Sequence, residues 1–205
     1  ITHADGRRLA LLINEFGEMG VDGEILKACG DEACGEDDIV ELTNGCICCT
    51  VADDFLPTLN ILLDREDPPD HILIETSGLA LPKPLVKAFQ WPEVRSRTTV
   101  DSVIAVVDGP AVQAGLFADD PVAVQAQREA DEMLDHDSPL AEVYEDQLAC
   151  ADIVVLSKID LMDGAALEQT KTDILADAGA GVQVIAADHG ALDPALVLGV
   201  NAEVE

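Results

Sequence analysis

Short apolar runs alternate along the chain with segments whose apolar residues recur at helical spacing. The runs predict β-strands within residues 7–16, 39–42, 71–75, 100–108, 151–160 and 181–187. The spaced segments predict helices at residues 51–64, 81–90, 121–134, 138–149 and 163–178. Strands that alternate with helices favour an α/β fold, with a mostly parallel sheet covered by helices on both faces.

Composition narrows the class of protein. A length of 205 residues suggests one domain, and 48% apolar residues with only 3% aromatics imply an aliphatic core. No apolar run approaches the roughly 20 residues of a membrane span. A net charge of −30 repels phosphate backbones, so nucleic acid is not an expected partner. The acidic residues are spread along the chain, which favours a solvated acidic surface adapted to salt.

The predicted strand at residues 71–75 ends in chemically marked residues. Glu75 follows a buried run and is followed by Thr76, Ser77 and Gly78. Ligands gather at the carboxyl edge of a parallel sheet, where Glu75 is suited to bind the water shell of Mg²⁺ or to orient an attacking water. Gly78 allows a backbone N–H to approach a phosphate closely. The alternative is a carboxylate that caps the next helix.

A second marked strand end lies in residues 151–160, where Ser157, Lys158 and Asp160 follow the apolar run IVVL. A carboxylate at Asp160 is able to accept the N1–H and the exocyclic amine of guanine. The stem of Lys158 is able to cover the purine face. This short pattern occurs often by chance, but its place after a strand favours a guanine-nucleotide site.

No GxxxxGK[ST] sequence occurs in the chain, so nothing in it is predicted to cradle the β- and γ-phosphates. The start, ITHADGRR, resembles the end of a helix that would follow such a loop. We therefore expect a chain truncated before residue 1.

Three cysteines stand within four positions in NGCICC: Cys46, Cys48 and Cys49. A disulfide is disfavoured, because nucleotide signals indicate a reducing cytosol and adjacent cysteines pair poorly. Inert packing is the stronger alternative, but the flanking NG and TVADD predict a turn. Thiolates select soft or borderline metal ions, so a metal site is favoured. Its fourth position remains for water, Glu15 or a ligand of the recipient protein.

The other candidate ligands are weaker. Cys29 and Cys34 belong to an acidic loop at residues 28–38, and Cys150 is expected in the core. No pair of histidines has metal-ligand spacing, and His136 is expected to cap or hydrogen-bond a turn.

Five segments together resemble the CobW family of P-loop GTPase metallochaperones: residues 13–26, 41–55, 72–86, 131–148 and 154–161. The GCxCC signature beside ETSG carries most of this resemblance. It implies a P-loop GTPase-like domain over residues 1–205, with a C-terminal CobW domain that this chain lacks. It also implies GTP and Mg²⁺ as cofactors, and GTP hydrolysis coupled to metal transfer, a reaction in which the chain alone is expected to be inactive.

The resemblance also assigns roles to the candidate residues. It implies metal binding by the GCICC cysteines with Glu15 as a supplementary ligand, and a catalytic role for Glu75. Nucleotide-binding residues would then be Asp22 in a switch-like loop, Gly78, Ser157, Lys158 and Asp160. Ser157 replaces the commoner Asn of the guanine motif, which should weaken one supporting hydrogen bond but not the contact of Asp160.

The cargo follows from the resemblance alone. Co²⁺ for cobalamin biosynthesis is the first expectation, with cobaltochelatase as a candidate recipient, and Zn²⁺ delivery is the alternative. Iron or cobalt loading of nitrile hydratase is a third option in the same family. A hypothesis of another class is a non-catalytic thiol or metal sensor. In the favoured mechanism, Mg-GTP orders residues 14–24 and the cysteine turn, and hydrolysis releases the ion.

Overall fold

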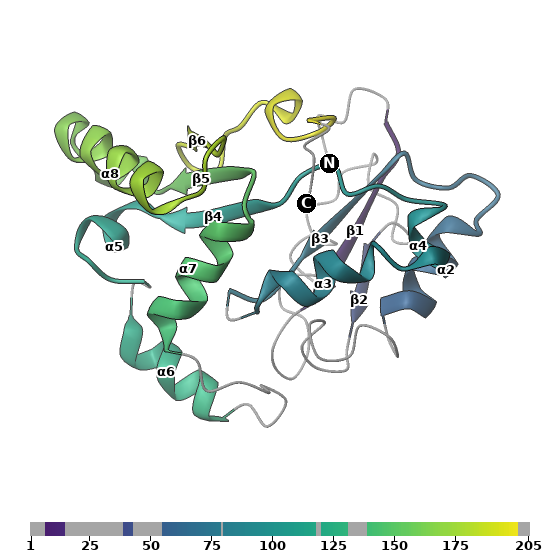
Figure 1. Cartoon of the computed structure of the whole chain (residues 1–205). Coiled ribbons are helices and arrows are strands. Elements are labelled where there is room, and N and C mark those ends of the chain that lie inside the picture. Colours follow the sequence, from purple (N-terminus) through teal and green to yellow (C-terminus); the bar gives the residue numbers. More distant parts are fainter. Residues whose placement is uncertain are drawn as a thin grey trace. The chain divides into compact units, whose positions relative to one another are not determined.

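The computed structural model describes residues 7–14, 39–42, 55–78, 80–117, 120–130 and 139–200, coloured in Figure 1. The chain divides into two compact units, which are described one at a time. The first unit comprises residues 1–98 and 131–135, and the second comprises residues 99–130 and 136–205.

The first unit is built on a parallel sheet of three strands in the order β2-β1-β3. These strands are β1 (Leu9–Asn14), β2 (Ile39–Leu42) and β3 (His71–Glu75). Leu9 of β1 lies opposite His71 of β3, and Ile13 lies opposite Glu75. The register therefore brings the carboxyl ends of β1 and β3 to the same edge of this sheet.

Three helices pack on this sheet through one apolar cluster: α2 (Leu56–Leu63), α3 (Pro82–Ala88) and α4 (Pro92–Arg95) (Figure 1). Phe55, Leu59 and Leu62 are buried against Ala10 and Leu12 of β1, and they recur at the helical spacing that predicts a helix within residues 51–64.

The second unit is built on a parallel sheet of three strands in the order β4-β5-β6. Its strands are β4 (Ile104–Asp108), β5 (Ile153–Ser157) and β6 (Gln183–Ala186). The central strand β5 is buried on both faces: Val154 and Leu156 belong to one apolar cluster, Ile153 and Val155 to another. This continuous burial explains why β5 has an unbroken apolar run.

Helices and short 3₁₀ turns complete the second unit: α5 (Gly109–Gln113), α6 (Pro121–Ala130), α7 (Leu140–Cys150), η3 (Ile159–Leu161), α8 (Gly164–Asp177) and η4 (Pro194–Leu196). Leu148 of α7 and Ile174 of α8 pack with Val154 and Leu156 on one face of β5. On the other face, Ile153 and Val155 pack with residues that follow β6, including Val197.

The prediction of an α/β fold with parallel strands is confirmed, since every strand pair of the two sheets is parallel. The strand predicted at residues 100–108 begins only at Ile104, and the helix predicted at residues 81–90 ends at Ala88. The pattern missed α4 and α5, which have four and five residues. Within the described part of the chain, no helix is long and apolar enough to cross a membrane.

Candidate functional site

The loop after β5 carries three of the predicted nucleotide-binding residues. The buried strand delivers Ser157 at its end, and the chain then turns sharply, because Lys158 adopts the left-handed conformation with φ of +56°. Asp160 follows in the short turn η3. Non-glycine residues rarely adopt positive φ, so the conformation of Lys158 is a distinctive feature of this loop.

The first two residues of this loop are tied to the neighbouring strand β4. The Ser157 hydroxyl donates a hydrogen bond of 2.9 Å to the Val107 carbonyl. The Lys158 ammonium lies 2.5 Å from the Asp108 carboxylate. The Ser157 hydroxyl therefore joins the ends of β5 and β4, and its predicted place among the nucleotide-binding residues stays a prediction.

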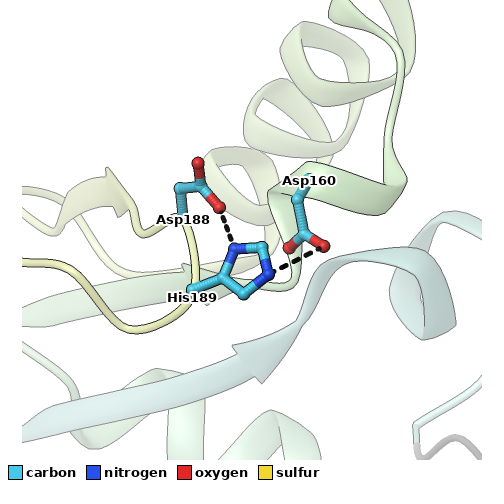
Figure 2. A group of neighbouring side chains, drawn as sticks. All are labelled: Asp160, Asp188 and His189. Carbon is cyan, nitrogen blue, oxygen red and sulfur yellow. Dashed lines mark hydrogen bonds and ion pairs between the residues drawn. The ribbon is translucent and has the colours of Figure 1, made fainter.

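Asp160 has a partner that sequence analysis missed. The Nε2 atom of His189 lies 3.8 Å from the Asp160 carboxylate, and the other ring nitrogen of His189 contacts the Asp188 carboxylate (Figure 2). The imidazole therefore stands between two carboxylates, in a turn after β6. His189 itself has φ of +48°, and the turn is closed by a backbone bridge between Asp188 and Ala191.

These contacts shift the pKa of His189 upward from its ordinary value of 6.5. The hydrogen bond to Asp188 is the main cause, and the negative charges of Asp160 and Asp188 add to it. The side chain is exposed. No spacing of histidines in the sequence indicates this cluster, because only the fold of the second unit brings residue 189 to residue 160.

The three side chains of this cluster are of kinds that bind metal ions, and their candidate ligand atoms lie within 4.8 Å of one another. All three residues are exposed. Exposed acidic groups commonly lie together without an ion, so proximity alone gives no reason to assign a metal here. The geometry instead makes His189 a titratable neighbour of the predicted guanine-reading carboxylate.

In the first unit, Glu75 is exposed at the carboxyl end of β3. Gly78 follows in an exposed turn, and a side chain added there would meet nothing within 4 Å. This open space fits close approach of a ligand to the backbone, although packing places no demand for glycine at this position. The backbone N–H of Ala80 donates to the Ser77 carbonyl and closes the turn.

Several predicted site residues lie outside the described residues: Cys46, Cys48, Cys49, Glu15 and Asp22, together with Cys29, Cys34 and His136. Cys150, at the end of α7, lies within the described residues, is half-buried and is in no disulfide. The structure therefore brings together Ser157, Lys158 and Asp160 in the second unit, and Glu75 and Gly78 in the first.

Parallel strands joined by helices, with charged side chains at the carboxyl ends of β3 and β5, are typical of a nucleotide-binding α/β domain. The chain belongs to the CobW family: the family model described as CobW/HypB/UreG, nucleotide-binding domain, matches residues 1–185. The family prediction made from the GCICC, ETSG and SKID segments is thereby confirmed.

Two curated relatives are similar to this chain over its full length. The chain is 55% identical to a zinc chaperone CobW of Sinorhizobium sp. over 205 residues, which cover 100% of this chain and 58% of the relative. It is 52% identical over 209 residues to a zinc chaperone CobW of Pseudomonas aeruginosa, covering 100% of this chain and 56% of that protein. The chain thus spans a little over half the length of these curated relatives.

A solved structure supports the fold. The crystal structure of the Zn(II)-bound YjiA GTPase from E. coli superposes with a TM-score of 0.54 at 22% identity, covering 96% of this chain and 54% of that one. At this identity the likeness establishes the P-loop GTPase-like α/β fold and not the site.

Proposed function

We propose that this chain is the nucleotide-binding part of a GTP-dependent metallochaperone that carries Zn²⁺ in the cytosol and transfers it to a recipient protein. The observation that carries the proposal is the Ser157-Lys158-Ile159-Asp160 loop at the end of the buried strand β5, in a chain similar over its full length to two proteins named zinc chaperones.

Asp160 is the residue we propose to select guanine. Its carboxylate accepts two hydrogen bonds, one from N1–H and one from the exocyclic amine of the base. Adenine presents no such pair of donors, so the carboxylate would face an acceptor and lose affinity. The stem of Lys158 covers the purine face while its ammonium stays polar.

Glu75 and Gly78 are the residues we propose for the phosphate end of GTP. The exposed carboxylate of Glu75 fits a hydrated Mg²⁺ ion or an attacking water, and the open turn at Gly78 fits backbone approach to a phosphate. Mg²⁺, when bound, would neutralise charge on the phosphate oxygens. Asp22 is proposed to contact the nucleotide from the switch-like loop.

Cys46, Cys48 and Cys49 are the proposed ligands of the transported Zn²⁺, with Glu15 as a supplementary ligand. Three thiolates leave one position of a tetrahedral ion open, which suits transfer to another protein better than a closed site. Binding of GTP is proposed to order this segment and raise metal affinity, and hydrolysis to lower it.

Zinc replaces cobalt as the favoured cargo because of the relatives. Similar proteins at 55% and 52% identity are named zinc chaperones, whereas the resemblance by itself favoured cobalt for cobalamin biosynthesis. Thiolate sites for Co²⁺ and Zn²⁺ have similar ligands, so a direct competition of the two ions in the presence of a GTP analogue separates these cargoes.

Guanine selection is tested with Asp160→Asn in the full-length protein. Asparagine donates where aspartate accepts, so affinity should move from GTP toward xanthosine triphosphate, which has a carbonyl in place of the exocyclic amine. Loss of charged hydrogen bonds should weaken GTP binding about 10- to 100-fold. Asp163→Asn, at the cap of α8, is the matched control and should keep guanine preference. An unchanged preference in Asp160→Asn contradicts the proposal.

Metal coupling is tested by measuring Zn²⁺ affinity with and without a non-hydrolysable GTP analogue and Mg²⁺. Serine at Cys46, Cys48 or Cys49 should abolish tight binding, whereas Cys150→Ser, which removes a thiol outside the GCICC segment, should not. Equal affinities with and without the analogue contradict the switch. A metal response that survives Asp160→Asn would instead favour the sensor hypothesis.

A further inference from the structure

The two carboxylate oxygens of Asp108, at the end of β4, contact different partners. One oxygen accepts a hydrogen bond of 3.0 Å from the backbone N–H of Ala111 and so caps α5. The other lies 2.5 Å from the Lys158 ammonium. One side chain therefore fixes the start of a helix and the head of the lysine in the proposed guanine loop.

The register of the β4–β5 pair explains why Asp108 contacts Lys158. Asp108 lies directly opposite Ser157 in the parallel pair β4–β5, so residue 158 emerges beside residue 108, although 50 positions separate them. The hydroxyl of Ser157 binds the carbonyl of Val107, one residue earlier on β4. The two strand ends are thus held at a fixed separation where the loop begins.

The loop after β5 also packs closely against Gly109. A side chain at this buried glycine would place its Cβ 2.5 Å from the sulfur of Met162 and 3.0 Å from the Ser157 carbonyl oxygen. The loop therefore packs against Gly109 at both of its ends, since Ser157 begins it and Met162 follows η3. Such packing leaves the backbone of the loop little freedom to drift away from Asp108.

The exposure and the charges of Asp108 and Lys158 also favour an ion pair between them. The Asp108 side chain is 21% exposed and the Lys158 side chain 47% exposed, so the pair is partly shielded from solvent. Burial raises the pKa of Asp108, but the hydrogen bonds from Lys158 and Ala111 and the positive charge of Lys158 outweigh it and lower the pKa overall. Asp108 is therefore ionised at neutral pH.

From these contacts we infer that Asp108 is a positioning residue for nucleotide binding. Its ion pair with the Lys158 ammonium holds the lysine side chain in a conformation in which the aliphatic part can contact the purine face. The inference rests on the proposed function, because it assigns a role to the same loop. Anchoring the ammonium removes rotamers that would otherwise be lost when the nucleotide binds. Removing the anchor should weaken GDP binding about three- to tenfold.

The variant Asp108→Asn tests this role in the full-length protein. Asparagine caps helices as well as aspartate does, so α5 should be preserved while the ion pair is lost. Asp163→Asn is the matched control, because Asp163 caps α8 through Ala166 and takes part in no ion pair among the described residues. We expect weaker GDP binding in Asp108→Asn, unchanged binding in Asp163→Asn, and similar unfolding midpoints for both.

A double-mutant cycle with Lys158→Met separates positioning from a general structural effect. Methionine keeps an apolar stem and removes the ammonium, so Asp108→Asn should cost nothing further in that background. Additive losses of GDP affinity would overturn the inference, and so would an Asp108→Asn variant that binds GDP normally. Asp108→Ser, which caps α5 without charge, replaces Asp108→Asn if that variant does not fold.

Failure of this inference is distinguishable from failure of the proposed function. If Asp160→Asn keeps its preference for guanine, the assignment of the loop to guanine selection is wrong. If that variant shifts toward xanthine nucleotides while the cycle of Asp108 and Lys158 is additive, only the role of Asp108 is wrong.

Discussion

The imidazole of His189 lies 3.8 Å from the Asp160 carboxylate, the group that is also proposed to bind the guanine base. Protonation gives the ring a positive charge that attracts this carboxylate, and both Asp160 and Asp188 favour that charged form. An ion pair of His189 with Asp160 would have to be broken before this carboxylate binds a base, so we expect protonation of the ring to oppose nucleotide binding.

We predict that guanine-nucleotide affinity falls as the pH is lowered through the raised pKa of His189. Above that pKa the ring is neutral and leaves Asp160 available, and below it the ion pair must be broken. Because the pair is exposed, the change should be modest, about two- to fivefold. Titration of GDP binding between about pH 5.5 and 8.5 measures it.

The control for this effect is a comparison of two histidine variants. His189→Gln should flatten the pH profile, whereas His71→Gln, at the start of β3, should leave it as in the unaltered protein. A profile that His189→Gln does not change would show that this ring does not compete for Asp160.

A second prediction concerns acid stability. Arg8 binds Asp70 through two guanidinium nitrogens at 2.8 and 3.2 Å, and its backbone N–H also donates to that carboxylate at 2.9 Å. The side-chain hydrogen bond from Arg8, then its backbone hydrogen bond and its charge, lower the pKa of Asp70 to about 2. This contact ties the residue before β1 to the residue before β3.

Because the folded pKa of Asp70 is depressed, its stabilising contribution is present above the ordinary value of 3.8 and is lost as the pH falls toward about 2. Asp70→Asn should therefore remove part of the decline in unfolding free energy between those pH values. Asp67→Asn is the control, since Asp67 is 86% exposed and lies 3.5 Å from Arg8. Chemical denaturation over this pH range gives the answer, and identical profiles for the two variants would contradict the prediction.

Neighbouring residues of α2 provide a third prediction. Leu62 is fully buried in the apolar cluster on β1, while Ile61 beside it is 66% exposed. Leu62→Ala should lower the unfolding free energy by about 2–5 kcal/mol through lost burial and a cavity. Ile61→Ala should change it by about 0.5 kcal/mol or less. Comparable losses in the two variants, measured by denaturant unfolding, would mean that α2 packs through a different face.

The hydrophobic pattern of the sequence predicts the strands and their burial, but it does not predict contacts between residues that are distant along the chain. The run of β5 is buried on both faces, as an unbroken apolar run requires. β4 was predicted to begin at residue 100, but the Val103 N–H donates to the Asp152 side chain and its carbonyl accepts from residues 152 and 153. These loop contacts take the place of a strand ladder, and no hydrophobicity pattern reports them.

The same distinction applies to the candidate site. Lys158 and Asp160 were found because they follow a strand in a recognisable local order. Asp108 and His189 were missed because register and a turn of positive φ bring them to the loop from about 50 and 30 positions away. Residues that act through a neighbour leave no local spacing to detect.

The last prediction concerns Tyr144, the single tyrosine of the chain. Its hydroxyl is buried and has no hydrogen-bond partner among the described residues, while its ring packs 5.3 Å from that of Phe117. Burial, together with the negative charge of Asp177, raises the pKa of Tyr144 to about 12. Since a buried hydroxyl without a partner costs stability, Tyr144→Phe should leave the unfolding free energy unchanged or raise it by about 1 kcal/mol.

Two measurements test this expectation for Tyr144. Denaturant unfolding compares Tyr144→Phe with Tyr144→Leu, which loses the aromatic contact and should be less stable by about 1 kcal/mol or more. Alkaline titration gives the pKa of Tyr144 directly. The phenolate absorbance of the unaltered protein is followed with pH, and that of Tyr144→Phe is subtracted as the background. A phenolate that forms near pH 10, the ordinary value, would show that the hydroxyl is solvated, and a destabilised Tyr144→Phe would show that it has a partner.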